Sequence, residues 1–231
     1  VAPGGSRPQG PEWARPDTGS STVRVLGDRL LANEQETAAY AAGLAALVQV
    51  GDVIALRGDL GAGKTTLARA LIRAYGNPDE EVPSPTFTLV QIYEPCRAGA
   101  VPLWHFDLFR VALPEDALEL GIEDAFAAGV TLIEWPERLG PLLPARRLDL
   151  VLAPGPDPDS RRMTMSGTAA WGARLRQAGL PDRAHVIAQF LDAAGWTRAE
   201  IKPLAGDASF RRYHRVRRNG SVAMLMDAPP D

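Results

Sequence analysis

The chain has little of several features that would place it in a large class of proteins. Its 231 residues contain one cysteine, Cys96, so it cannot form an internal disulfide, which excludes a disulfide-stapled secreted domain and fits a reducing compartment. No apolar run approaches the roughly 18 residues that a membrane-spanning helix needs. The formal net charge is only −3, so no overall basic field indicates nucleic acid as a direct partner. We therefore expect a cytoplasmic protein with no membrane partner.

Lysine is also scarce, because only two of the 25 basic residues, Lys64 and Lys202, are lysines. Lys64 belongs to Gly58–Thr65, which reads GDLGAGKT and matches the P-loop pattern G-x-x-x-x-G-K-[ST] in full. The apolar run Val53–Leu56, typical of a buried strand, precedes it, and an amphipathic helix is predicted after it. A lysine kept here in an arginine-rich chain indicates a need for an ammonium point charge. The motif therefore predicts a site for a nucleoside triphosphate with Mg²⁺.

The chemistry of a P-loop assigns a role to each residue type in it. Glycines let the backbone curl so that successive N–H groups point at phosphate oxygens. Lys64 is expected to reach the β- and γ-phosphates, and the Thr65 hydroxyl to ligate Mg²⁺. The residues expected to hold the nucleotide are Asp59, Leu60, Gly61, Ala62, Gly63, Lys64, Thr65 and Thr66.

Two acidic residues end predicted strands after the P-loop helix. A P-loop enzyme needs such an acid to hold the Mg²⁺ shell and polarise water, and both Asp107 and Glu134 qualify as catalytic residues beside Lys64. The sequence does not decide which of them contacts the metal. Ser84 and Thr86 could sense the γ-phosphate as a switch, with a proline-fixed turn as an equally weighted alternative. His105 lies in an apolar strand pattern, which favours a packed side chain over a ligand.

Composition and periodicity divide the chain into four parts. Residues 1–22 are predicted to be a disordered leader. Residues 23–167 alternate apolar strands with helices, which predicts an α/β fold of the P-loop NTPase type, a mostly parallel sheet flanked by helices. Residues 168–181 are interpreted as a linker. Residues 182–231 are too few to bury a core and are interpreted as an incomplete α+β extension.

Local patterns predict individual elements. A first strand is expected at residues 22–26. Asn33 followed by Glu36 predicts a helix that begins with a capping box. A single helical stretch is expected over about residues 114–126. Asp182 is expected to cap a helix with Val186, Ile187, Phe190 and Leu191 on one face. The arginines that follow are interpreted as a solvated strand or loop, with a local basic patch for nucleic acid as the alternative. They are Arg211, Arg212, Arg215, Arg217 and Arg218.

The remaining motifs narrow the kind of P-loop protein. No Asn-Lys-x-Asp segment surrounds either lysine, so adenine is favoured over guanine nucleotides. Nucleotide kinases usually carry several lid arginines, and residues 94–130 offer only Arg97 and Arg110. Three classes of P-loop protein remain compatible with these residues. They are an ATPase that acts on a partner, a small-molecule kinase, and an interaction module that binds nucleotide without turnover.

Five linked motifs lie at residues 58–66 (GDLGAGKTT), 83–90 (PSPTFTLV), 105–110 (HFDLFR), 119–122 (ELGI) and 133–137 (IEWPE). Together they resemble the TsaE (YjeE) family across about residues 23–167. The resemblance implies an ATPase that works with TsaB and TsaD to make N6-threonylcarbamoyladenosine at position 37 of tRNA, contacting tRNA only through the complex. Such an enzyme is expected to be nearly silent alone, because its water-positioning geometry can depend on partners.

The same resemblance implies roles for individual residues. It implies Thr65 and Glu134 as Mg²⁺ ligands and Asp107 as a required acid. Residues 84–87 would be switch-like. Further contacts with the nucleotide would fall around residues 33–37 and near Arg162.

The last part of the chain carries a second resemblance. Residues 204–213 and 222–229 resemble the opening of aminoglycoside-phosphotransferase-like sugar kinases, which implies a truncated kinase N-lobe fused behind the ATPase domain. Leu225 stands where the strand lysine of such kinases is expected, so no complete second active site is predicted. Sugar kinase activity associated with this part is the alternative function, and a simple C-terminal extension is the alternative interpretation.

Overall fold

The computed structural model describes residues 23–95, 99–180, 183–204 and 212–227. The expected leader at 1–22, Cys96 and the expected helix cap Asp182 lie outside these described residues. No helix in the described part of the chain is both long enough and apolar enough to cross a membrane.

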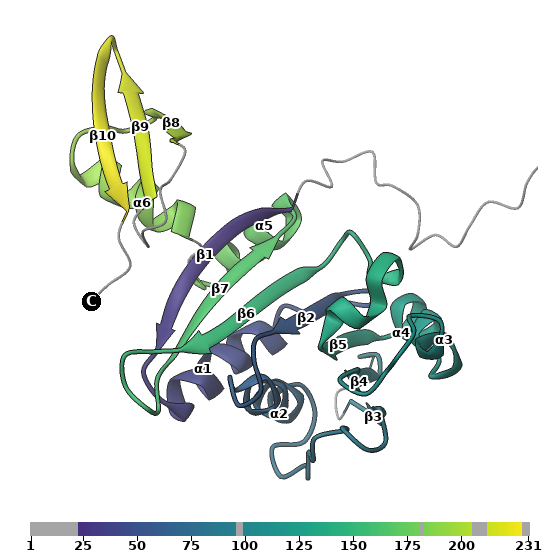
Figure 1. The fold of residues 1–231 in the computed structure, drawn as a ribbon. Helices are drawn as coiled ribbons and strands as arrows, with labels where there is room; N and C mark the ends of the chain where they lie inside the picture. Colours follow the sequence, from purple (N-terminus) through teal and green to yellow (C-terminus); the bar gives the residue numbers. More distant parts are fainter. Residues whose placement is uncertain (1–22, 96–98, 181–182, 205–211, 228–231) are drawn as a thin grey trace, which may run out of the picture.

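A seven-stranded sheet forms the centre of the larger part of the molecule, in the order β1-β7-β6-β2-β5-β4-β3 (Figure 1). Strands β6, β2, β5 and β4 pair in parallel, and β7 and β3 run against their neighbours. Five strands therefore share one direction, which confirms the predicted mostly parallel α/β sheet. The strands are β1 (Arg24–Leu31), β2 (Val53–Arg57), β3 (Val90–Tyr93), β4 (Leu103–Asp107), β5 (Val130–Glu134), β6 (Leu148–Pro154) and β7 (Arg161–Gly167).

Helices cover both faces of this sheet, which explains why apolar residues on its central strands are buried on both sides. In β2, Ile54 and Leu56 join the core cluster that includes the first two helices, whereas Val53 joins the cluster on the other face. Helices α1 (Glu34–Ala45) and α2 (Lys64–Tyr75) belong to the first face, and α3 (Asp116–Glu119), α4 (Ile122–Ala128) and the 3₁₀ helix η2 (Pro136–Leu142) to the second.

The start of α1 follows the capping pattern that the sequence predicted. The Asn33 side chain accepts a hydrogen bond from the Glu36 backbone N–H at 3.0 Å. The Glu36 carboxylate accepts in return from the backbone N–H of Ala32, one residue before the cap. Two backbone donors at the helix start are thus satisfied, as in a capping box.

Two predicted elements have different bounds in the structure. Strand β1 continues to Leu31, beyond the expected end at residue 26, because it pairs with β7 along its length. The single helix expected at 114–126 is split into α3 and α4 by Gly121, whose φ of +76° lies in the left-handed region. That conformation favours glycine and cannot continue a helix.

The linker interpretation is wrong for residues 169–177, which form helix α5 (Ala169–Gln177). Trp171 and Leu175, one helical turn apart, are buried in the cluster that contains α1 and α2. Leu180 then packs against α1, where a Cβ at Gly43 would lie 3.1 Å from the Leu180 side chain. Burial of this apolar stripe orders the segment against the sheet.

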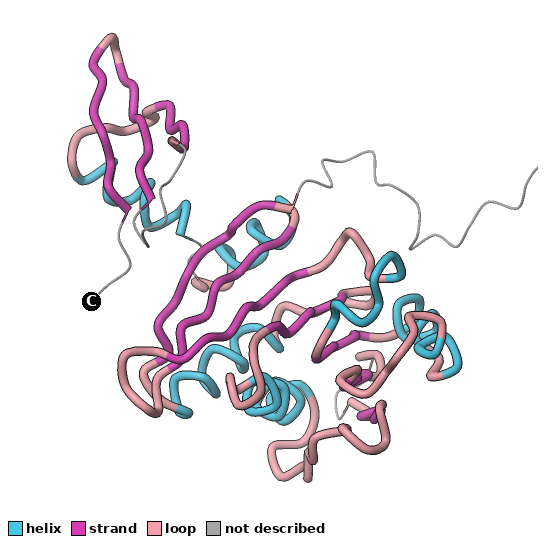
Figure 2. The backbone as a smooth tube through the Cα atoms, viewed as in Figure 1, coloured by secondary structure: helices cyan, strands magenta, loops and turns pink. Residues whose placement is uncertain are grey.

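The last part of the chain consists of helix α6 (Arg183–Ala193) and an antiparallel sheet of β8 (Glu200–Pro203), β9 (Arg212–Arg218) and β10 (Ser221–Asp227), in the order β10-β9-β8 (Figure 2). Asn219 and Gly220, both with positive φ, join β9 to β10, which suits a two-residue hairpin turn. Leu191 of α6 is buried as expected, but Phe190 is exposed.

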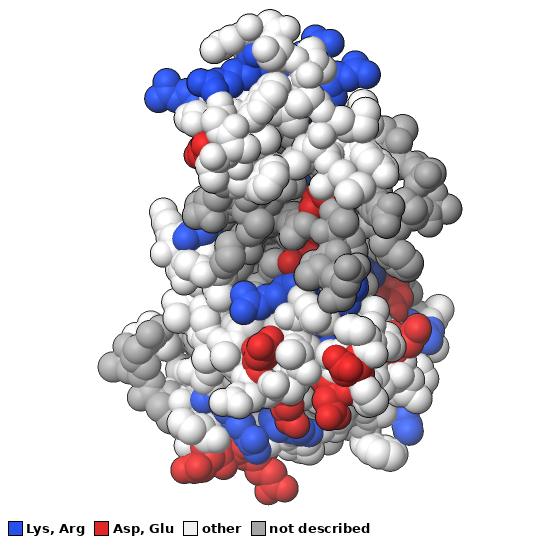
Figure 3. Space-filling view, turned by 90° about the vertical axis from the view of Figure 1, so that its left-hand side faces the viewer, with Lys and Arg blue, Asp and Glu red and all other residues white. Residues whose placement is uncertain are grey.

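The arginines of this part lie on an open strand. Arg215 and Arg217 are exposed on β9. On the face that Figure 3 shows, Lys and Arg gather over the β9–β10 hairpin, and Asp and Glu gather at the opposite end. This placement agrees with the interpretation of the cluster as a solvated strand.

The packing of α5 leads to a first prediction. Trp171→Ala should lower the free energy of unfolding by about 3–5 kcal/mol, because it leaves a large cavity in the core. The matched change Gln177→Ala, at an exposed position of the same helix, should alter it by less than about 0.5 kcal/mol. Urea unfolding measures both, and an equally small effect of the two changes would return this segment to the status of a linker.

Candidate functional site

The P-loop occupies the strand-to-helix position that the motif requires. It leaves β2 at Gly58 and enters α2 at Lys64, with Gly58, Gly61 and Gly63 at φ values of +136°, +79° and +100°. A Cβ at Gly58 would lie 2.3 Å from the carbonyl oxygen of Leu152 on β6. Glycine is therefore required at the first position both by conformation and by space.

The Lys64 ammonium folds back over this loop. Its Nζ donates hydrogen bonds to the carbonyl oxygens of Gly58 at 2.7 Å and of Asp59 at 2.9 Å. Burial lowers the pKa of this ammonium, and the nearby carboxylates of Glu134 and Asp107 oppose that shift. The lysine of the P-loop thus lies between backbone carbonyl oxygens of its own loop and the two acids.

The two acids predicted from the sequence lie side by side. Strands β4 and β5 pair in parallel with Asp107 opposite Glu134, and β5 pairs with β2 with Glu134 opposite Leu56. Both carboxylates are buried, at 3% and 2% exposure. Because the carboxyl ends of parallel strands meet at one edge, both acids reach the P-loop, which follows the same end of β2.

Glu134 is the acid that contacts the P-loop threonine. Its Oε2 accepts a hydrogen bond from Thr65 Oγ1 at 3.0 Å. Its Oε1 lies 3.1 Å from Nε2 of His105, a histidine with no exposed surface. The expectation that His105 is packed is correct, but its contact with Glu134 was not predicted. The sequence signal for this contact is the spacing of two residues between His105 and Asp107, which puts both side chains on one face of β4.

Asp107 accepts hydrogen bonds from the two predicted switch residues, Ser84 and Thr86. Its Oδ2 accepts from Thr86 Oγ1 at 2.6 Å and from Ser84 Oγ at 3.3 Å, and the two hydroxyl oxygens lie 2.8 Å apart. Its Oδ1 accepts from the backbone N–H of Phe109. The residues between α2 and β3 are thereby tied to the end of β4.

Trp135 also lines the phosphate cavity, and no role was predicted for it beyond its place in the motif IEWPE. It follows Glu134 directly and has a φ of +59°, uncommon for a bulky residue. Its ring lies 3.9 Å from Lys64 Nζ, a cation–π contact, and packs against the Phe109 ring with centroids 4.9 Å apart. The backbone turn after β5 thus places two packed aromatic rings, one of them in contact with the Lys64 ammonium, at the site.

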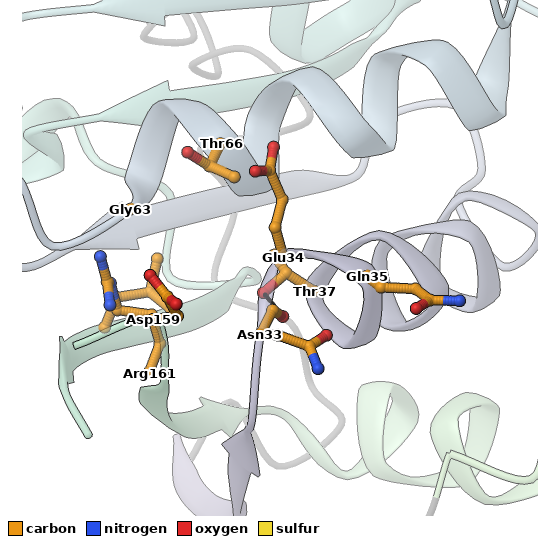
Figure 4. Close-up of a pocket in the computed structure, with 9 residues that line it drawn as sticks. Asn33, Glu34, Gln35, Thr37, Gly63, Thr66, Asp159 and Arg161 are labelled. Carbon is orange, nitrogen blue, oxygen red and sulfur yellow. Dashed lines mark hydrogen bonds between the residues drawn. The ribbon is translucent and has the colours of Figure 1, made fainter. Parts of the chain in front are cut away.

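Two adjoining cavities meet at the P-loop. The first, of about 300 Å³, is lined by P-loop residues, the hydroxyls of Ser84 and Thr86 and both acids. The second, of about 450 Å³, lies by the start of α1, where Asn33 and Thr37 face Asp159 and Arg161 across the space and Gln35 points away (Figure 4). The residues that line both cavities are Gly63, Thr66 and Arg161.

Of two adjacent arginines, Arg161 lines both cavities and the predicted Arg162 lines neither. A Cβ at Gly63 would lie 3.4 Å from Arg161 Nε. Both belong to β7, where successive side chains point to opposite faces, so a shift of one residue moves the guanidinium to the other side of the sheet. The sequence offered two adjacent arginines and no signal to choose between them.

The ligand set at the P-loop fits a hard cation held partly by phosphate. Thr65 and Glu134 supply a hydroxyl and a carboxylate within hydrogen-bond distance of each other. Among the described residues, no group of three or more His, Cys, Asp and Glu could hold a metal. Mg²⁺ is usually bound by one or two protein oxygens together with substrate phosphates and water, which is the pattern this edge of the sheet offers.

Comparison with known proteins gives one consistent family. The family model described as "Threonylcarbamoyl adenosine biosynthesis protein TsaE" matches residues 31–163. A protein named tRNA threonylcarbamoyladenosine biosynthesis protein TsaE from Rickettsia bellii is 37% identical over 131 residues, covering 56% of this chain and 89% of the relative. Its namesake from Bacillus subtilis is 38% identical over 135 residues, covering 58% and 81%.

A solved structure agrees with these sequence matches. Bacillus subtilis YdiB superposes with a TM-score of 0.55 at 31% identity, covering 68% of this chain and 96% of YdiB. The matched span of the family model includes the P-loop, both acids, the Ser84–Thr86 segment and Arg161. More than half of the chain matches the family model, and the chain therefore belongs to the TsaE family.

Proposed function

We propose that this protein is a Mg²⁺-dependent ATPase that supports threonylcarbamoylation of adenosine 37 in tRNA, working in the cytoplasm with TsaB- and TsaD-like proteins. The observation that carries the chemistry is the convergence of Lys64, Thr65 and Glu134 at one edge of the sheet. The names of the family and of the two relatives supply the biosynthetic role. Contact with tRNA is indirect in this proposal, through the complex.

In this proposal the two cavities bind different parts of the nucleotide. The phosphates lie in the cavity lined by the P-loop, and the nucleoside lies in the cavity at the start of α1. Arg161, which lines both, supplies a guanidinium near their junction. The N–H groups at the start of α2 and the Lys64 ammonium balance the phosphate charge.

Thr65 and Glu134 hold the metal, and Asp107 organises the adjacent segment. Bound Mg²⁺ would neutralise the negative charge that develops on the phosphates. The Thr65 hydroxyl and one Glu134 oxygen are its protein ligands, supported by their 3.0 Å separation. Asp107 holds the hydroxyls of Ser84 and Thr86 beside the phosphate cavity, where they respond to the γ-phosphate as a switch.

Partner proteins complete the site in this proposal. Leu60 and Phe109 line the mouth of the phosphate cavity, and Leu60 and Phe87 are each 82% exposed. Exposed apolar side chains gathered at a site are typical of a surface that another protein covers. Partner docking here would exclude water from the cavity and fix the switch segment, which raises the rate of hydrolysis.

We also propose that α6 and the strands β8–β10 are the opening part of a phosphotransferase-like N-lobe, starting near residue 182. A helix followed by three antiparallel strands supports this assignment. No activity is assigned to this part, because Leu225 on β10 stands where a kinase lysine is expected.

The assignment of Arg161 leads to a matched pair of variants. Arg161→Ala should raise the Kd for ADP by about tenfold or more, since a hydrogen bond to a charged group contributes roughly 1.5–3 kcal/mol. Arg162→Ala should change this Kd by less than about twofold. Isothermal titration calorimetry measures both, and a larger loss in Arg162→Ala would restore the sequence-based assignment.

The two acids are separated by changes that keep their shape. Glu134→Gln should lower ATP turnover on the order of 10²-fold or more, because the metal and the developing phosphate charge lose a carboxylate. The affinity for ADP without Mg²⁺ should stay close to that of the parent protein. A phosphate-release assay on Glu134→Gln and Asp107→Asn measures turnover, and unchanged turnover in Glu134→Gln would give the metal role to Asp107.

The biosynthetic role is tested by reconstitution. With TsaB, TsaD, tRNA and the threonylcarbamoyl donor, the protein should stimulate formation of the modified nucleoside, and Lys64→Ala should not. Labelled γ-phosphate distinguishes the alternative: release as free phosphate is expected, and label on a sugar would indicate a kinase instead. Absence of any stimulation by the parent protein would contradict the proposed role.

A further inference from the structure

His105 is a buried polar side chain beside the site that the proposed chemistry does not use. It lies on β4 with no exposed surface, two residues before Asp107 and on the same face of the sheet. In the register of β4 and β5, His105 lies opposite Leu132, so it is diagonal to Glu134. The ring contacts the carboxylate and is absent from the lining of the phosphate cavity.

The two nitrogens of this ring have different surroundings. Nε2 lies 3.1 Å from Glu134 Oε1. Nδ1 is buried and has no hydrogen-bond partner among the described residues. A buried polar atom without a partner costs free energy, so an apolar side chain of similar size would fill this space at lower cost. The imidazole therefore contributes one specific interaction, which is its contact with Glu134.

That contact divides the two oxygens of Glu134 between two neighbours. Oε1 faces His105, and Oε2 accepts from the Thr65 hydroxyl. A carboxylate free to rotate about its last bond would exchange these oxygens and change its distance to Thr65. A bond to Oε1 removes this freedom, in the way that outer hydrogen bonds fix the orientation of metal ligands.

We propose that His105 is a positioning residue: its Nε2–H donates to Glu134 Oε1 and holds Oε2 toward Thr65 and the Mg²⁺ position. This inference rests on the proposed function, because it assigns a purpose to the orientation of a metal ligand. His105 does not contact nucleotide or metal. It acts only through the Glu134 carboxylate.

Two amide side chains mimic the two ring nitrogens separately. The amide of Gln extends about as far as Nε2 and can donate to Glu134, whereas the shorter Asn extends only about as far as Nδ1. We expect His105→Gln to keep the Mn²⁺ affinity of the ADP complex within about threefold of the parent value. His105→Asn and His105→Leu should weaken it on the order of 10- to 100-fold. Electron paramagnetic resonance of free Mn²⁺ measures these affinities without any turnover.

The affinity for ADP without metal is the control. It should be the same in all three variants, because His105 does not contact the nucleotide. Equal Mn²⁺ affinity in the parent, Asn and Leu proteins would overturn the proposal. A parallel loss of metal-free ADP binding would also overturn it, because His105 would then support the site only by packing.

A second measurement needs no variant. In ¹⁵N-labelled parent protein, long-range ¹H–¹⁵N spectra of the His105 ring should show a proton on Nε2, and a ring protonated only at Nδ1 would refute the donor role. The proposed function fails separately, if the parent ADP complex binds Mn²⁺ in the expected pattern but the parent protein hydrolyses no ATP in the presence of its partners.

Discussion

The Glu134 carboxylate is the interaction on which the rest of the site depends. It is almost fully buried, and a buried carboxylate is costly unless its oxygens are bonded. Thr65 and His105 each take one oxygen, so the acid links the P-loop helix to the neighbouring strand. Its position follows from β5, which lies between β2 and β4 and pairs with both in parallel. The central strand of the site thus carries the acid that contacts the P-loop threonine.

Around this carboxylate the charges are arranged in two groups. On one side the Lys64 ammonium lies over carbonyl oxygens of its own loop and over the Trp135 ring. On the other side Asp107 collects the hydroxyls of Ser84 and Thr86. Burial lowers the pKa of Lys64, and the two acids counteract that effect. The Lys64 ammonium and the two acids therefore lie close together at the P-loop, in the cavity that the Arg161 guanidinium also lines.

Close contacts with strands β6 and β7 fix the position of the P-loop at this edge of the sheet. Gly58 approaches the Leu152 carbonyl on β6 too closely for any side chain, and Gly63 lies against Arg161 on β7. The loop is thus enclosed by strands that come about 90 residues later in the sequence. Helix α5 adds to this support, because Trp171 and Leu175 pack into the core beneath α1 and α2.

The amino-acid sequence by itself determined the P-loop, the cap at Asn33, the mostly parallel α/β fold and the family, because these depend on local patterns and on motif spacing. It also indicated both acids, since each ends an apolar strand. Only the tertiary structure decided which acid contacts Thr65, that Ser84 and Thr86 bond to Asp107, that Arg161 and not Arg162 lines the cavities, and that residues 169–177 pack as a helix. The reason is physical: strand register, strand facing and burial are set by pairing between distant segments, and a single sequence carries little information on such pairing.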